Sequence, residues 1–157
     1  MTLYGTVLLL YAVMASLVFG ASVYETVVVH PAWSREPPES MIGFWGAPIS
    51  RMNIPAFWAP VAPLYALSGL AALVAALSAG GASVSLVVSV VSAVATVGWT
   101  LVYFRPTIGR FLETGGGNAS AERLRSEARR WILLNWIRVA MVAVSWWGVL
   151  KATAAHG

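Results

Sequence analysis

The stretch YETVVVHPAW, residues 24–33, closes an apolar run that begins at Leu3 and places two titratable side chains near its end. Glu25 is the one acidic residue within an apolar segment of this chain, and His30 is one of its two histidines. A charged side chain inside a membrane-length segment costs about 2.5–3.5 kcal/mol on insertion scales unless it has a partner or lines a wet cavity. We therefore expect the other helices to supply that partner and that cavity.

The composition around this stretch is that of a membrane protein. The 157 residues are 59% hydrophobic and only 10% charged, whereas a soluble domain has about 25% charged residues. The chain has no cysteine, which excludes disulfides, iron–sulfur clusters and thiolate metal sites. The net charge of +4 comes mostly from arginines between the apolar segments. It indicates topology rather than affinity for nucleic acid, and we expect the lipid bilayer as the main partner.

Four apolar segments of membrane-spanning length follow one another. About 20 residues suffice to cross a bilayer, and we predict spans over about 3–29, 54–78, 82–104 and 131–151, with the last helix extended from about 119. Pro31 predicts that the first helix ends at Val29, because the residue before a proline disfavours the helical conformation. The predicted fold class is all-α, an integral membrane bundle of four transmembrane helices in a single domain over residues 1–157.

The first segment has an alternative interpretation as a cleaved signal peptide, with Gly-Ala-Ser at residues 20–22 as its cleavage site. We expect a transmembrane helix instead, because no lysine or arginine precedes the run and the run continues beyond Ser22. The connection over residues 30–53 is rich in prolines and aromatic side chains, which favour the headgroup level. A short interfacial helix near residues 38–44 would fit it.

Prolines and small residues mark two faces of the middle spans. Pro60 and Pro63 lie three residues apart on one helix face, and each removes a backbone hydrogen bond. They predict a kink or a widened first half of that helix, either as helix-start geometry or as a cleft near the loop. Ser85, Ser89 and Ser92 lie on nearly one face of the third span. We interpret them as packing residues, because small side chains let membrane helices approach closely.

The basic residues predict the orientation of the spans. Eight of the ten lysines and arginines fall on the side of the first and third loops. They are Arg35, Arg51, Arg105, Arg110, Arg123, Arg125, Arg129 and Arg130. Short loops that carry positive charge stay cytoplasmic. We therefore predict a multi-pass inner-membrane protein whose first and third loops are cytoplasmic and whose termini are both periplasmic. The arginine-rich opening of the last helix suits anionic headgroups, although a solvated charged face explains it equally well.

The last span carries polar side chains at a depth similar to that of Glu25. Trp131, Asn135 and Arg138 fall at positions i, i+4 and i+7, and hence on one helix face. We predict an ion pair between Glu25 and Arg138 inside the bundle, with Asn135 hydrogen-bonded nearby, because charge buried in lipid is tolerated when it is paired. This set is either a structural clamp that fixes helix register or the polar floor of a pocket, and the two roles are compatible.

His30 would lie at the rim of that pocket. Its ordinary titration falls near neutrality, so it could accept a proton, although an interfacial histidine is more often a satisfied residue at a helix end. One histidine without cysteine or aspartate does not make a stable metal site. We therefore predict no metal and no cofactor, with an axial haem ligand at His30 as the alternative.

Several short motifs occur in a distinctive order along the chain. Tyr-Glu at 24–25 and Pro-Ala-Trp at 31–33 are followed by Phe-Trp-Ala-Pro at 57–60, Tyr-Phe-Arg-Pro at 103–106 and Trp-x3-Asn-x2-Arg ending at Arg138. In this order the chain resembles the anthrone oxygenase-like family of small four-helix integral membrane proteins. The match is best at Pro106 and in the last motif. After the third span the family's oxygenases carry an Asn-rich stretch, where this chain has Thr-Ile-Gly-Arg.

The resemblance implies insertion of oxygen into an activated polyphenolic carbanion, and it leaves open whether a metal or flavin takes part. Such chemistry needs a base, which would be Glu25 or His30, and donors for the developing oxyanion, which would be Asn135 and Arg138. A flat, apolar, phenolic or quinone-like molecule would be the substrate, bound at the cytoplasmic end of the bundle. The predicted substrate-binding residues are Trp33, Trp58, Arg105 and Trp131.

The alternative function is that of a non-catalytic accessory or assembly subunit in a larger membrane complex. Its small-residue faces and tryptophans would then bind partner helices, pigment or lipid. A homo-oligomer is compatible with either function. A transporter fits less well, because four helices are few and no inverted repeat is visible.

Overall fold

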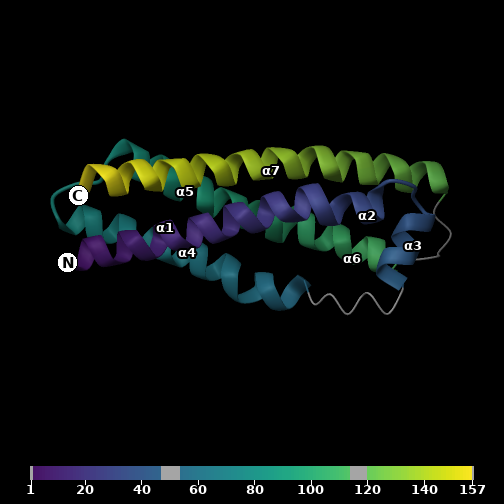
Figure 1. The fold of residues 1–157 in the computed structure, drawn as a ribbon, viewed down its shortest axis with the longest axis horizontal. Helices are drawn as coiled ribbons and strands as arrows, with labels where there is room; N and C mark the ends of the chain where they lie inside the picture. Colours follow the sequence, from purple (N-terminus) through teal and green to yellow (C-terminus); the bar gives the residue numbers. More distant parts are fainter. Residues whose placement is uncertain (1, 47–53, 114–119, 157) are drawn as a thin grey trace.

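The computed structural model describes residues 2–46, 54–113 and 120–156. Within these ranges all regular structure is helical, and four helices are long and apolar enough to cross a membrane. They extend over Leu3–Ser34, Ala56–Ser78, Val84–Phe111 and Ala121–His156. The prediction of an all-α, multi-pass membrane protein built as a four-helix bundle is therefore confirmed. The two termini lie together at one end of the bundle (Figure 1).

The first span is longer than predicted. α1 (Leu3–Tyr24) passes into the π-helical turn η1 (Glu25–Val29) and then into α2 (His30–Ser34). The prediction that Pro31 ends this helix at Val29 is wrong. η1 closes with a hydrogen bond from the next N–H to the carbonyl five residues earlier. This wider turn accommodates the proline, which has no N–H and whose ring would clash with the carbonyl four residues before it in a regular α-helix.

The third span repeats this arrangement. α5 (Val84–Trp99) passes into the π-helical turn η3 (Thr100–Phe104) and then into α6 (Arg105–Glu113). Pro106 takes the place in α6 that Pro31 takes in α2, so the prediction that this helix ends at residue 104 is wrong for the same reason. In both spans the first residue of the π turn lies six positions before the proline. Each proline therefore lies within a continuous helix.

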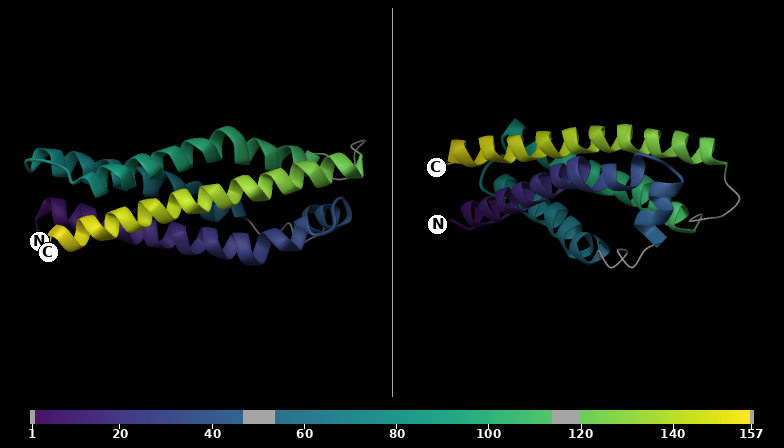
Figure 2. Two further views of the ribbon diagram at one scale, coloured as in Figure 1. Left: turned by 90° about the horizontal axis from the view of Figure 1, so that it is seen from above. Right: turned by 45° about the vertical axis from the view of Figure 1, so that its right-hand side comes forward.

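The other two spans are uninterrupted α-helices. α4 (Ile54–Ser78) continues through both of its interior prolines, and α7 (Ala121–His156) runs the whole length of the bundle (Figures 1 and 2). Between α4 and α5 the chain turns at Gly80 and Gly81, whose φ angles of 110° and 149° are accessible to glycine without strain. In Figure 1 and in the right-hand view of Figure 2, the start of α4 diverges from α1.

A short helix forms in the first connection, as predicted. α3 (Glu39–Gly46) lies at the end of the bundle opposite the termini, against α2 and α6 (Figure 1). Its Met41 side chain is 4% exposed, and Phe44 packs against the neighbouring aromatic side chains. α3 therefore closes this end of the bundle, which we term the loop end.

Buried apolar side chains form two clusters at different heights in the bundle. The aliphatic core joins α1, α4, α5 and α7, and it includes Leu8, Ala12, Ala15, Val18, Ala72, Leu86, Val90, Val142 and Val149. The aromatic core lies at the loop end and consists of Trp33, Met41, Phe104, Phe111, Ala128 and Trp131. Small side chains in the first cluster let the helices approach closely, while large rings fill the wider space in the second.

The serine face of α5 is a packing surface, as predicted. The hydroxyls of Ser89 and Ser92 donate to backbone carbonyls of α7. On the α7 side, a Cβ atom added to Gly148 would lie 2.7 Å from the carbonyl oxygen of Ser85. The two helix backbones are therefore in contact, and this face is not available to a partner helix.

Candidate functional site

Polar side chains gather where the two π turns face α7. Asn135 is completely buried at the centre. Its Nδ2 donates to Thr26 Oγ1 at 2.8 Å and lies 3.3 Å from His30 Nδ1, and its Oδ1 accepts from Arg138 Nε at 3.0 Å and from Nη2 at 2.8 Å. Arg138 Nη1 lies 3.5 Å from Thr100 Oγ1. These five residues are termed the arginine cluster.

Local helix geometry explains why these side chains meet. Asn135 and Arg138 are three residues apart on α7 and therefore share a face. Thr26 lies in η1 and Thr100 in η3, so each π turn contributes one hydroxyl. Each hydroxyl donates to the carbonyl four residues earlier in its own helix, at 2.7 Å and 2.8 Å respectively. The threonines are thus left as acceptors for the donors of α7.

The hydrogen bonds also determine the tautomer of His30. Arg138 is only a donor, so the Asn135 atom that it contacts must be the carbonyl oxygen, and the atom near His30 must be the amide nitrogen. His30 Nδ1 is then the acceptor, and a neutral His30 carries its proton on Nε2. No described residue forms a hydrogen bond with Nε2. The ring lies edge-on to that of Trp131, with 4.7 Å between centroids.

Arg138 is buried without a direct counter-ion among the described residues. Its side chain is 8% exposed, and its guanidinium carbon lies 5.0 Å from the centre of the Phe104 ring, within the range of a cation–π interaction. Among the described residues, the one pair of opposite charges closer than 4.0 Å is Arg123 with Glu127. The prediction of a Glu25–Arg138 ion pair is therefore wrong. The hydrogen-bond partners of Arg138 are neutral, and its charge is not cancelled at close range.

Glu25 bonds to α4 instead of α7. Its Oε1 accepts a hydrogen bond from Trp58 Nε1 at 2.6 Å, and no described residue bonds to Oε2. Glu25 and Arg138 still interact electrostatically through space. The direction of the Glu25 side chain has a geometric cause, because Glu25 and Thr26 are neighbours in η1 and only one of them can face α7. Thr26 faces α7, and the partly exposed Glu25 is turned toward α4.

The four predicted substrate-binding residues lie in three different places in the structure. Trp33 and Trp131 are only 1% and 2% exposed, and they lie in the aromatic core with 5.2 Å between their ring centroids. Trp131 Nε1 has no hydrogen-bond partner among the described residues. Trp58 donates a hydrogen bond to Glu25, whereas the side chain of Arg105 is exposed and forms no hydrogen bond with a described residue. The structure thus brings Trp58 to Glu25 and Trp131 to His30, and it leaves Arg105 apart.

Thr26, Thr100 and Phe104 also belong to the site, although the sequence pattern did not predict them. A signal for them exists in the spacing, because Glu25 and Thr100 each lie six residues before a proline inside a long apolar segment. In these two spans the turn before the proline is a π turn, and π turns are frequent at functional sites. No group of three or more histidine, aspartate or glutamate side chains that could hold a metal occurs among the residues that the structure describes.

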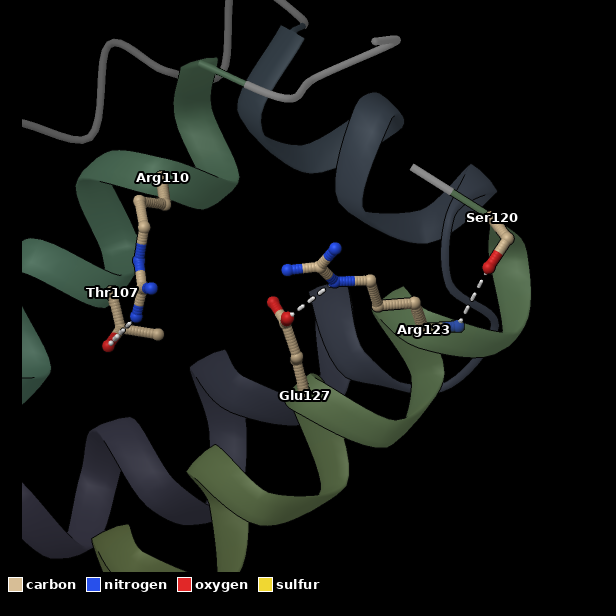
Figure 3. A network of polar contacts seen from close by, with 5 residues as sticks. All are labelled: Thr107, Arg110, Ser120, Arg123 and Glu127. Atoms are coloured by element: carbon tan, nitrogen blue, oxygen red, sulfur yellow. Dashed lines mark hydrogen bonds and ion pairs between the residues drawn. The ribbon is translucent and has the colours of Figure 1, made fainter. Parts of the chain in front are cut away.

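A second set of polar contacts lies at the loop end, on α6 and α7 (Figure 3). Arg110 Nη2 donates to Thr107 Oγ1 at 3.1 Å, and Arg123 Nε donates to Glu127 Oε1 at 3.0 Å. The N–H of Arg123 also lies 3.4 Å from Ser120 Oγ, which caps the start of α7. These contacts are local to their own helices, so they stabilise the helix ends rather than form a site.

Comparisons with known proteins do not assign a family. No family model, no curated protein and no solved structure matches this chain.

Proposed function

We propose that this chain is an integral membrane oxidoreductase of the anthrone oxygenase-like type, acting on a flat phenolic or quinone-like molecule. The observation that carries the proposal is the buried guanidinium of Arg138, whose hydrogen-bond partners among the described residues are all neutral. A buried charge without a counter-ion is costly. The oxygen of a bound phenolate or enolate would supply the missing negative charge. A dry, charged site of this kind stabilises an oxyanion more strongly than water does.

Each polar side chain has a role that its contacts allow. Asn135 holds Arg138 with two hydrogen bonds, so the guanidinium is positioned before a substrate binds. Trp58 holds one oxygen of Glu25 and leaves the other to take a proton from the substrate. His30 offers the N–H of its Nε2 as a further donor.

The proposed reaction balances with dioxygen as the oxidant. Glu25 takes one proton from the ring methylene of an anthrone, and Arg138 stabilises the charge that moves onto the substrate oxygen. Dioxygen then forms a bond to the carbanion carbon, and the returning proton gives a hydroperoxide. Cleavage of its O–O bond, with loss of the second C–H hydrogen, forms the quinone carbonyl and releases water. One oxygen atom enters the product and the other leaves in the water.

The surroundings of Glu25 favour a substrate that arrives through the lipid. Glu25 and Trp58 are both half-buried, and the adjacent Phe57 is 39% exposed with its ring edge-on to Trp58 at 5.0 Å. An apolar ring could stack on these aromatics at the start of α4 before its oxygen meets the buried donors. On the side of the aromatic core, Trp131 packs against His30 and Phe104 packs against Arg138.

Oxygen consumption in lipid nanodiscs tests the proposal. With a hydroxyanthrone as substrate, the wild-type protein should consume dioxygen and form the coloured quinone. Glu25→Gln should lower kcat by about 100-fold, and Arg138→Gln by a similar factor, whereas Arg130→Gln removes an exposed arginine of α7 and should leave kcat unchanged. Tryptophan fluorescence should show that Glu25→Gln still binds the substrate.

Two further outcomes distinguish the alternatives. A folded wild-type protein that neither binds nor oxidises phenolic ligands, and that co-purifies with a stoichiometric partner, would favour the accessory-subunit function. An absorption spectrum of the purified protein belongs to the same experiment, because a Soret band abolished by His30→Ala would establish a haem.

We also propose that the loop end faces the cytoplasm of the inner membrane, on the basis of its arginines. Because the chain has no cysteine, single cysteines report topology directly. A membrane-impermeant maleimide added to spheroplasts should label Ala155→Cys at the terminal end and should not label Ser126→Cys at the loop end. The reverse pattern would invert the proposed orientation.

A further inference from the structure

A pocket lies at the loop end, between the end of the first span and the opening turns of α7. It has a volume of about 290 Å³ and is lined by Ser34, Arg35, Glu36, Pro37, Arg125 and Arg129. Three arginines against one glutamate give this lining a net charge of +2. We infer that this pocket, termed the basic pocket, binds the phosphate group of an anionic lipid headgroup.

The walls of the basic pocket are joined by one hydrogen bond. Arg125 Nε donates to the backbone carbonyl of Pro37 at 2.9 Å, which connects residues 88 positions apart in the chain. This bond uses one of the five N–H groups of the guanidinium. Both terminal nitrogens of Arg125 remain free of bonds to any residue that the structure describes. The pocket therefore has a fixed wall that presents donors.

The positive charges of the basic pocket are not cancelled within the described protein. Neither Arg35, Arg125 nor Arg129 forms an ion pair within 4.0 Å with a described carboxylate. Arg123 on the same helix differs, because it pairs with Glu127 at 3.0 Å (Figure 3). Guanidinium groups that surround one space repel each other until an anion lies between them. A phosphate, with several acceptor oxygens, can bind more than one of them at once.

The position of the basic pocket favours a lipid as the source of the phosphate. Ser34 is the last residue of one candidate span, and Arg125 and Arg129 lie in the opening turns of another. The pocket is thus at the border between apolar and polar segments, where headgroups lie. Arg129 precedes Arg138 by nine residues, or about 14 Å at the α-helical rise. The basic pocket is therefore separate from the arginine cluster and does not depend on the proposed function.

Native mass spectrometry of the full chain, released from nanodiscs of phosphatidylcholine with added phosphatidylglycerol, tests the inference. Arg129→Gln and Arg35→Gln should each weaken retention of phosphatidylglycerol about tenfold, since each removes a charge-assisted hydrogen bond to the phosphate. Arg130→Gln is the matched control, because it removes the same charge from the next position of α7, outside the pocket, and should change retention less than twofold. An equal loss in Arg130→Gln would show a diffuse charge effect and overturn the inference.

A second arm separates a lipid from a soluble anion. Inorganic phosphate and glycerol 3-phosphate at millimolar concentration should not displace phosphatidylglycerol from the wild-type protein. If inorganic phosphate alone binds in pure phosphatidylcholine nanodiscs, and if Arg129→Gln abolishes that binding, the ligand is soluble and the lipid source is wrong. All three arginines are exposed, and circular dichroism should show that the variants keep their helix content.

Discussion

The bundle contains two buried polar clusters that join the same three spans in different ways. Toward the termini, the hydroxyl of Tyr11 lies 2.8 Å from Ser89 Oγ and 2.9 Å from Ser145 Oγ, and these three residues form the tyrosine–serine cluster. They come from α1, α5 and α7 at points where all three are regular α-helices. Toward the loop end, the arginine cluster joins the same spans through η1, η3 and α7, and it contains a charge.

This difference indicates that the tyrosine–serine cluster is a structural clamp and that the arginine cluster is a candidate site. The three hydroxyls of the tyrosine–serine cluster satisfy one another, and the small residues around them hold the helices close. In the arginine cluster Arg138 keeps its charge, and Nε2 of His30 and Oε2 of the adjacent Glu25 bond to no described residue. Neutral closed networks contribute modestly to membrane-helix association. An ionisable group left open within a membrane span is by default a functional-site hypothesis, which is why the proposal rests on the second cluster.

The largest expected effect comes from removing the centre of the arginine cluster. Asn135→Leu deletes both hydrogen bonds to Arg138 and those to Thr26 and His30, and it leaves a buried guanidinium without its main partner. We expect a loss of about 4 kcal/mol in the free energy of unfolding, in the range for breaking a buried charged contact. Reversible unfolding in mixed micelles, followed by circular dichroism, measures it. A loss below 1 kcal/mol would show that the arginine cluster contributes no more to stability than a neutral cluster does.

A carboxylate at the same position sharpens this test. Asn135→Asp keeps the shape of the side chain and gives Arg138 a direct counter-ion. We expect this variant to recover at least half of the stability that Asn135→Leu loses. The proposed oxidation should nevertheless fall, because the guanidinium would then be neutralised by the protein instead of by the substrate. Retained turnover with this variant would argue against Arg138 as the oxyanion donor.

The next effect tests the close packing around the tyrosine–serine cluster. A Cβ atom on Gly148 would lie 2.7 Å from the carbonyl oxygen of Ser85 and 2.9 Å from the Cβ of Ser89, so α5 and α7 would have to separate. We expect Gly148→Ala to cost about 2 kcal/mol, as overpacking does. Gly98→Ala is the matched control, since nothing lies within 4 Å of its added Cβ. An equal cost in both variants would show that backbone effects, not helix contact, dominate.

Hydropathy and helical periodicity predict the fold and part of the membership of the site, but neither its threonines nor its pairing. They place Glu25, Asn135 and Arg138 at a similar depth and His30 at the rim, and the structure brings His30 to Asn135 and Asn135 to Arg138. They do not predict which of two adjacent residues in η1 faces α7. A period of 3.6 residues assumes regular α-helix, and the π turn changes the rotation of every side chain that follows it.

The proline rule fails in the first and third spans for a related reason. It is derived from helices in which a lost hydrogen bond and a ring clash end the structure. In a membrane span the alternative to helix is an unsatisfied backbone in lipid, which is costlier than a π turn. Both helices therefore continue past Pro31 and Pro106 to Ser34 and Glu113. In the first and third spans a proline therefore marks a π turn instead of a helix end, whereas Pro60 and Pro63 lie within the regular α-helix α4.

Removing one hydroxyl from the tyrosine–serine cluster should have a smaller effect on stability. Tyr11→Phe removes the hydroxyl that contacts Ser89 and Ser145, and the serines can still bond to each other or to backbone carbonyls. We expect a cost of about 1 kcal/mol, because interhelical hydrogen bonds in membrane proteins average below that value. Turnover of the proposed substrate should stay unchanged. A cost as large as that of Asn135→Leu would mean that both clusters are clamps and that burial alone sets their energies.

The smallest expected loss of stability comes from breaking a surface ion pair on α7, and it gives a reference value for the buried contacts. Arg123 and Glu127 form an ion pair at 3.0 Å, with side chains 73% and 39% exposed. Water and salt screen such a pair, so Arg123→Gln should cost about 0.4 kcal/mol at low ionic strength and less in high salt. The unfolding experiment used for Asn135→Leu measures this value as well. If Arg123→Gln cost as much as Asn135→Leu, the charge of α7 and not its burial would control stability, and the missing counter-ion of Arg138 would no longer mark a binding site.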